Sequence, residues 1–269
     1  MLSAYGRLDG HHGTRELVVR SPHDNYDVLL YRERAEERTI WTVDVLMRLQ
    51  FTFEAGTMGA WTPAQEALFM RGFERAVRAV WATPTLLPRT ARREVGFRPV
   101  FDMSSRSRSD EHWNVMVRRQ LPEDAFEERG RAVQGTRATR RSPTATNFVF
   151  LNQLQNEPIW GRRREQIRSA HEYGHMLNLW SDEYEARSAH HGDPESIMHS
   201  GNLVRARHLA HFRMWAEGQI GRVEAREREE ARRRQAEFER FRRDALRGEP
   251  AACDAYRHLD ERQRRRVDG

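Results

Sequence analysis

The sequence predicts an α+β fold with a mixed, twisted β-sheet, a helix that backs it, a second helix with two histidines, and a mainly helical C-terminal part. Three observations lead to this prediction. Several segments between residues 41 and 154 alternate apolar and polar side chains, as half-buried strands do. A helical pattern over residues 161–179 places two histidines on one side. Residues 221–247 are dense in Arg and Glu, with few large apolar side chains.

The first predicted elements are a strand, a helix and two further strands. Residues 41–53 alternate apolar and polar side chains over much of their length, which is typical of a strand. The helix that follows has Thr62 as its N-cap and Pro63 at its first position, and both residue types are favoured there. Residues 95–103 and 112–120 are predicted strands, separated by the polar turn SSRSRSDE.

A loop and one more strand complete the part of the chain ahead of the histidines. Residues 122–146 are rich in charge, Gly and small side chains, which predicts a long exposed loop. Residues 147–154, NFVFLNQL, predict a strand. The helix over residues 161–179 then begins after Pro158 and Gly161, with good helix formers leading to the histidines.

His171, Glu172 and His175 carry the strongest chemical signal in the chain. Two imidazoles four positions apart project from the same side of an α-helix, so both can donate a nitrogen to one metal ion at about 2 Å. Glu172 then lies beside the metal. From there it can take a proton from a water molecule that the metal acidifies and pass it to a leaving amine. The alternative is a helix with two ordinary, partly buried histidines.

The residues that follow resemble a family of metallopeptidases. The run HEYGHMLNLWSDEY, residues 171–184, looks like the bacterial metallopeptidases, among them the IgA-peptidase-like group, that carry HExGH and then Asp-Glu-Tyr after six residues. DPESIMHSGN, residues 193–202, is similar to the metzincin Met-turn, in which a methionine forms a hydrophobic floor beneath the metal; here it would be Met198. The resemblance implies a zincin fold of upper and lower lobes, with zinc as cofactor.

A hydrolytic zinc ion needs a third protein ligand and an open position for water. In metzincins this ligand is a histidine, but the matching position here is Ser181. Asn178 tolerates the left-handed conformation that ends helices, so the chain can turn back toward the metal there. Asp182 is the first choice because a hard carboxylate oxygen suits zinc. Glu183 is the alternative, and further choices lie in the next loop, at His190 and His191.

Further roles follow from the resemblance. Astacin-like metzincins have a tyrosine after the Met-turn methionine, where this chain has His199 and Ser200. Tyr184 or His199 could instead donate a hydrogen bond to the oxyanion of peptide hydrolysis, although Tyr184 could equally pack under its loop. The strand at residues 147–154 would be an edge strand that pairs with an extended substrate; an ordinary sheet strand is the alternative.

The C-terminal part differs in character from the rest. Residues 204–215 have apolar side chains at helical spacing and are expected to pack under the Met-turn. Residues 221–247 predict a long solvent-facing helix with i,i+4 ion pairs, and a short helix is expected beyond Pro250. The chain then divides into an N-terminal extension (1–40), an upper lobe with the histidine helix (41–180), a lower lobe with the third ligand and Met-turn (181–220), and a charged tail (221–269).

Composition limits the environment and the partners. Cys253 is the one cysteine, so no internal disulfide can form. No apolar run is long enough for a membrane span, and the N-terminus lacks the apolar stretch of a secretory signal. We therefore expect the protein to start in the cytoplasm of the producing cell; action elsewhere needs a signal-independent secretion or injection system. The net charge of +6 comes with no recognisable nucleic-acid module, so the basic clusters are expected to be solvated surface.

All 46 basic residues are arginine, and the chain has no lysine. Codon bias in a GC-rich genome explains this, or else the chain avoids the ε-amino groups that ubiquitin ligases modify, which would suit a secreted effector or toxin. Taken together, the sequence predicts a zinc-dependent endopeptidase that acts on a protein or peptide, with its oligomeric state left open. The alternative is a catalytically inactive metal-binding scaffold or protein-interaction module.

Overall fold

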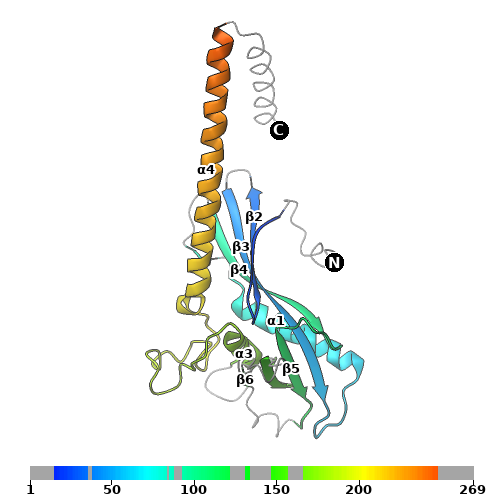
Figure 1. Cartoon of the computed structure of the whole chain (residues 1–269). Coiled ribbons are helices and arrows are strands. Elements are labelled where there is room, and N and C mark those ends of the chain that lie inside the picture. Colours follow the sequence, from blue (N-terminus) through cyan, green and yellow to red (C-terminus); the bar gives the residue numbers. More distant parts are fainter. Residues whose placement is uncertain are drawn as a thin grey trace, which may run out of the picture. The chain divides into compact units, whose positions relative to one another are not determined.

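The computed structural model describes residues 15–35, 38–83, 85–87, 93–121, 131–133, 147–156 and 166–247. These residues form a seven-stranded mixed sheet and three α-helices (Figure 1). The α+β class and the mixed sheet that the sequence predicts are therefore confirmed. The chain divides into two compact units, residues 1–213 and 214–269. The sheet, the first two helices and all candidate site residues belong to the first unit.

The strands are β1 (Glu16–Pro22), β2 (Asp27–Ala35), β3 (Arg38–Glu54), β4 (Arg93–Ser104), β5 (Trp113–Arg118), β6 (Arg131–Val133) and β7 (Asn147–Asn152). β3 is the longest and organises the sheet. Its first half pairs with antiparallel β2, and most of its length pairs with parallel β4. Leu49 in β3 pairs with both Met103 of β4 and Trp113 of β5, so β4 and β5 lie on opposite edges of β3. β5 therefore pairs with the same edge of β3 as β2 does, further along the strand. The four strands predicted from residue 41 onward are confirmed.

Three features of the sheet differ from the sequence-based expectations. β1 and β2 lie within residues 1–40, where an extension was expected. The apolar run at residues 28–30 is buried, but it is too short to indicate a strand by itself. β6 lies within the loop expected at residues 122–146, the rest of which is outside the described residues. β7 is not an edge strand, because β6 pairs with it on the side opposite β5.

Helix α1 (Pro63–Trp81) backs the sheet, as Figure 1 shows. It begins as predicted: the Thr62 side chain accepts a hydrogen bond from the Gln65 backbone, and the Gln65 side chain accepts one from the Thr62 backbone. This capping box satisfies two backbone donors that a helix start would otherwise leave open. Its buried face reaches the sheet through Phe73, which packs edge-on against Phe51 and Phe101 at 5.7 and 5.5 Å between ring centroids.

Helix α3 (Arg168–Met176) carries the two histidines and begins later than the predicted residue 161. Ile167 has an extended backbone and caps the helix, and its backbone N–H donates to the Asn202 side chain at 2.8 Å. Residues 161–165 lie outside the described residues. On its apolar side α3 is fixed to α1, since the Trp81 indole donates to the Ala170 carbonyl at 2.7 Å and stacks edge-on with Tyr173.

Asn178 ends the histidine helix in the left-handed conformation that the sequence predicts, with φ of 72°. Its side-chain oxygen accepts a hydrogen bond from the Asn25 amide. Asn25 is buried and accepts in turn from the Asn147 amide at 2.7 Å and, through its backbone carbonyl, from the Trp113 indole at 3.0 Å. The end of α3 is thereby tied to the place where β2, β5 and β7 begin.

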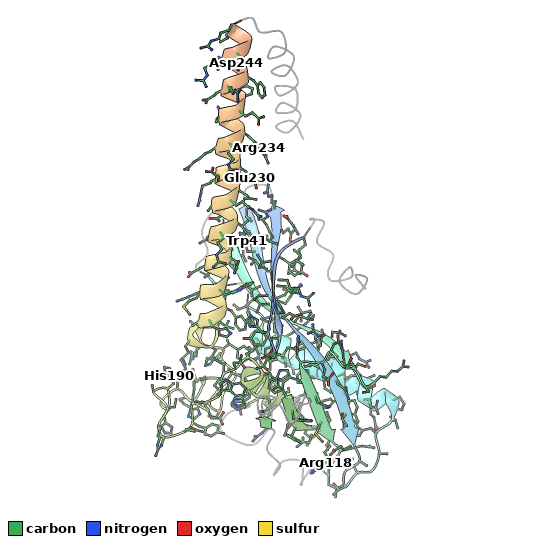
Figure 2. The ribbon with its side chains drawn as sticks, in the orientation of Figure 1. Trp41, Arg118, His190, Glu230, Arg234 and Asp244 are labelled. Carbon is green, nitrogen blue, oxygen red and sulfur yellow. The ribbon has the colours of Figure 1, made fainter. Side chains whose placement is uncertain are left out.

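The C-terminal segment is a short 3₁₀ helix, η2 (Ala206–Leu209), followed by the long helix α4 (Ala210–Leu246). The helix predicted over residues 221–247 is confirmed and is continuous with the residues before it. Its mostly exposed side chains form i,i+4 ion pairs such as Arg234 with Glu230 at 3.6 Å and Arg240 with Asp244 at 3.8 Å (Figure 2). In the described part of the chain no helix has both the length and the apolar character to cross a bilayer. The short helix expected beyond Pro250 falls outside the described residues.

The left-handed backbone at Asn178 gives a first prediction. Asn178→Gly removes the amide but suits a positive φ, whereas Asn178→Ala also places a methyl group where an ordinary side chain is strained. We expect the alanine variant to be less stable than the glycine variant by about 1 kcal/mol. Urea unfolding of both variants measures the difference. Equal stabilities would show that the backbone relaxes out of this conformation.

Candidate metal centre

The structure brings His171 and His175 of α3 together with Asp182, which lies in the loop after the helix. One ligand atom from each lies within 4.8 Å of the other two. The Nε2 atoms of His171 and His175 are 3.1 and 3.2 Å from the same oxygen, Oδ1 of Asp182. Ligands of a tetrahedral zinc ion, each about 2 Å from the metal, are roughly 3.3 Å apart. The separations between the carboxylate and the imidazoles are therefore suited to shared coordination of one ion.

Backbone carbonyls fix which nitrogen of each imidazole faces this centre. Nδ1 of His171 donates to the Ile197 carbonyl at 2.7 Å, and Nδ1 of His175 donates to the Leu179 carbonyl at 2.6 Å. A carbonyl oxygen can only accept, so both protons of the neutral imidazoles reside on Nδ1. Each Nε2 then presents a lone pair toward Asp182. This is the arrangement that metal-binding histidines commonly adopt.

Asp182 presents a negative oxygen to those two lone pairs. Oδ1 is buried and has no hydrogen-bond partner. Oδ2 accepts a hydrogen bond from the Tyr184 hydroxyl, which orients the carboxylate so that Oδ1 points to the imidazoles. Three acceptor atoms without a shared proton or cation repel one another, and a buried acceptor left unsatisfied is unfavourable. The chemistry of this donor set therefore fits a divalent metal ion.

The electrostatics of the centre favour positive charge. Burial on its own would lower the pKa of His175, but contact with Asp182 and the negative charges of Glu172 and Asp182 raise that pKa above its usual value. Burial would likewise raise the pKa of Asp182, yet the two imidazoles and the Tyr184 hydroxyl hold it well below its usual range. Glu172 itself is buried, at 3% exposure, and lies on α3 between the two histidines.

Met198 lies against the segment of α3 that joins the two histidines. A Cβ atom added at Gly174 would come within 2.3 Å of the Met198 sulfur and 3.1 Å of the Trp81 ring. Only glycine therefore permits this approach. The tight turn that delivers Met198 is closed by the backbone N–H groups of His199 and Gly201, which both donate to the Ser196 carbonyl at 3.0 Å. The same turn supplies the carbonyl of Ile197 that orients His171.

Glu183, the alternative third ligand, does not face the histidines. Its carboxylate accepts two hydrogen bonds from Arg207, each at 2.7 Å, and a third from His208 at 3.0 Å. Burial raises the pKa of Glu183, but the hydrogen bonds from Arg207, Ser196 and His208 together outweigh this effect and lower the pKa to about 2. The charge of Glu183 is thus already balanced, and the structure offers Asp182 as the third donor.

The remaining predicted residues surround the centre without joining the ligand group. His191 donates from Nδ1 to the Tyr184 carbonyl at 2.9 Å, and His190 is exposed on the same loop (Figure 2). His199 contacts Ser200 through Nδ1 at 2.8 Å, and its ring centroid is 6.1 Å from that of Tyr184. The Tyr184 hydroxyl is bonded to Asp182, so in this arrangement Tyr184 orients a candidate ligand instead of facing a substrate.

Gln166 is a supporting residue that the sequence did not single out. Its side-chain amide donates to the carbonyls of Ile197 at 2.9 Å and His199 at 3.1 Å, and lies 3.2 Å from Nδ1 of His171. It therefore holds the turn against the first histidine. No spacing rule marks a glutamine five residues before a metal-binding histidine, so the sequence held no signal for it.

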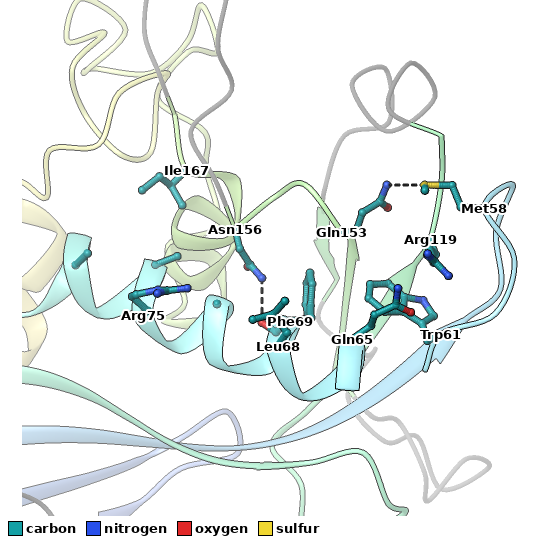
Figure 3. Close-up of a pocket in the computed structure, with 13 residues that line it drawn as sticks. Met58, Trp61, Gln65, Leu68, Phe69, Arg75, Arg119, Gln153, Asn156 and Ile167 are labelled. Carbon is teal, nitrogen blue, oxygen red and sulfur yellow. Dashed lines mark hydrogen bonds between the residues drawn. The ribbon is translucent and has the colours of Figure 1, made fainter. Parts of the chain in front are cut away.

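A separate pocket of about 610 Å³ lies between α1 and the loop after β7 (Figure 3). Its wall is mainly apolar and includes Trp61, Phe69 and Ile167. At its rim the Asn156 side chain donates to the Phe69 carbonyl at 3.1 Å. Its lining contains none of the three candidate metal ligands.

Comparison with known proteins gives no relative: no family model, curated protein or solved structure matches the chain. The resemblance of residues 171–202 to metallopeptidases therefore remains one of short motifs.

The contact between Gly174 and Met198 gives a second prediction. Gly174→Ala should cost about 1–3 kcal/mol, because the added methyl group overlaps the sulfur. Met198→Ala should cost about 2–5 kcal/mol through the cavity that it leaves. The double variant should lose clearly less than the sum, since truncating Met198 removes the overlap. Free energies of unfolding for the four proteins measure this coupling. Additive losses would mean that the two residues do not touch.

Proposed function

We propose that the chain is a zinc-dependent endopeptidase whose metal is held by His171, His175 and Asp182. The observation that carries the proposal is the convergence of two imidazole Nε2 atoms on one buried carboxylate oxygen at 3.1 and 3.2 Å. Three protein ligands with a free fourth position are typical of catalytic zinc, whereas structural zinc sites have four. The ligand set of two nitrogens and one oxygen also favours zinc over the all-oxygen sites of calcium or magnesium.

Zinc bound at this centre would lower the pKa of a water molecule and polarise the carbonyl of the scissile peptide bond. Glu172 is the proposed general base. It accepts a proton from the attacking water as the water oxygen bonds to the carbonyl carbon, and it delivers the proton to the amine as the carbon–nitrogen bond breaks. Its place on α3 next to His171 and its burial beside the imidazoles support this role.

Other residues have supporting roles in the proposal. Tyr184 orients Asp182, and Met198 forms an apolar floor under the histidines. His199 is the proposed donor to the oxyanion that develops on the substrate. The Ser200 hydroxyl donates to the Pro194 carbonyl at 3.1 Å, so it accepts from Nδ1 of His199 at 2.8 Å, and the role requires a second ring proton on Nε2. The proposed substrate is a protein or peptide. A role as an exported effector or toxin draws only on the absence of lysine.

The third prediction concerns Glu172→Gln. The variant keeps the ligand atoms and the size of the side chain, so we expect it to bind zinc in the same stoichiometry as the wild type. Cleavage should fall by about 10²-fold to 10⁴-fold because the base is lost. Incubating each protein with a proteome and identifying newly formed N-termini measures cleavage, and elemental analysis measures zinc.

The matched control is Glu185→Gln, which changes an exposed glutamate of the next loop and should leave cleavage unchanged. If Glu172→Gln cleaves as fast as the wild type, Glu172 is not the base. If the zinc-loaded wild type cleaves nothing, the endopeptidase proposal fails and the inactive metal-binding scaffold takes its place.

A further inference from the structure

Glu183 is a buried charged residue that the proposed hydrolysis does not use. It directly follows the candidate ligand Asp182, and it is 6% exposed. Its hydrogen bonds are short: Arg207 donates to both carboxylate oxygens at 2.7 Å, and His208 donates at 3.0 Å. A fork of two parallel hydrogen bonds fixes orientation as well as distance. The backbone that leads to Asp182 is therefore held from one side.

The same residue is also attached to the Met-turn, residues 196–199. The Glu183 backbone N–H donates to the Met198 carbonyl at 2.8 Å. Nδ1 of His208 accepts from the Arg205 backbone at 3.1 Å, so its proton resides on Nε2. That Nε2 atom lies 3.0 Å from Glu183 and 3.3 Å from the Ser196 hydroxyl. Glu183 thus connects the Asp182 loop, the Met-turn and η2.

The far end of the Asp182 loop is fixed to the same segment. Asp193 accepts hydrogen bonds from Arg205 at 2.9 and 2.6 Å and from Arg207 at 2.7 Å. Arg207 therefore spans Glu183 and Asp193, which lie ten positions apart in the sequence. Both ends of the loop are held by neighbouring arginines.

We propose that Glu183, Arg207 and His208 form a positioning unit that sets the affinity of the metal centre. The loop contributes Asp182, and the Met-turn contributes the Ile197 carbonyl that orients His171. If Glu183 loses its contacts, the Asp182 loop and the Met-turn both lose a point of attachment. The positions of Asp182 and His171 are then disturbed, although neither residue is removed. The inference rests on the proposed metal centre, and it adds residues that touch neither metal nor substrate.

The test is Glu183→Gln in the full chain, with zinc affinity measured against a competing chelator. The substitution keeps the size of the side chain but removes the charge that balances Arg207. We expect the zinc Kd to rise by about 10-fold to 100-fold, the usual effect of losing support behind a metal ligand. With Co²⁺ in place of zinc, the visible absorption of the variant should differ from that of the wild type, because Asp182 is no longer held in position.

The matched control is Asp44→Asn, which removes a charge of similar burial from the sheet. Asp44 is 3% exposed and pairs with Arg98 at 2.8 Å and Arg15 at 2.9 Å. This variant should be less stable than the wild type. Its zinc Kd should stay within twofold of the wild-type value, and its Co²⁺ spectrum should be unchanged. If Asp44→Asn weakens zinc binding as much as Glu183→Gln does, the effect is one of general stability and the proposal is overturned.

A second variant, Arg207→Lys, keeps the positive charge but loses the two-pronged contact. It should weaken zinc binding less than Glu183→Gln does, and it serves as the test if the glutamine variant does not fold. Unchanged zinc affinity in whichever variant folds overturns the positioning role while the metal centre stands. A wild-type protein that binds no zinc overturns the metal centre and this inference together.

Discussion

Two backbone carbonyls govern the arrangement of the candidate metal centre. Those of Ile197 and Leu179 each accept the Nδ1 proton of one histidine, so both Nε2 atoms face inward as acceptors. The Asp182 oxygen between them is a third acceptor, and acceptors this close repel one another unless a metal ion or a further proton lies between them. Because the two carbonyls hold the Nδ1 protons, the Nε2 atoms are left in an arrangement that fits the metal ion that we propose. The rest of the structure can be understood as the means of holding these two carbonyls in place.

Different parts of the fold hold each carbonyl. Ile197 belongs to the tight turn that Gln166 and the contacts around Glu183 keep against α3. Leu179 follows Asn178, whose left-handed backbone is tied through Asn25 to the starts of β5 and β7. The sheet therefore contributes to the centre although it supplies none of the candidate ligands. Because α3 is short, these external contacts matter more for its orientation than its own hydrogen bonds do.

The sequence predicted the parts of the structure that local rules determine. His171 and His175 share a helix face by spacing alone, Thr62 caps α1 by residue type, and β3 follows from alternation. Contacts between residues far apart in the sequence could not be predicted from local patterns. Asn25 and Asn178 are 153 positions apart, and the arginine that balances Glu183 is 24 positions away. Which of Asp182 and Glu183 faces the histidines depends on such distant partners. Sequence spacing alone therefore left both residues as candidates for the third ligand. Strands β1 and β2 were not predicted for a related reason: β2 pairs with β3 and β1 pairs with β2, so each is stabilised by a neighbouring strand although its own sequence pattern is weak.

The close approach of Gly174 to Met198 has a consequence for the response of this protein to oxidants. The Met198 side chain is 1% exposed, so peroxide reaches its sulfur only when the turn opens. A sulfoxide oxygen formed at that moment would have no room beneath α3, and the turn could not close again as before. Oxidation of this one sulfur atom would then separate Ile197 from His171, so the rate at which that contact is lost would report how often the turn opens.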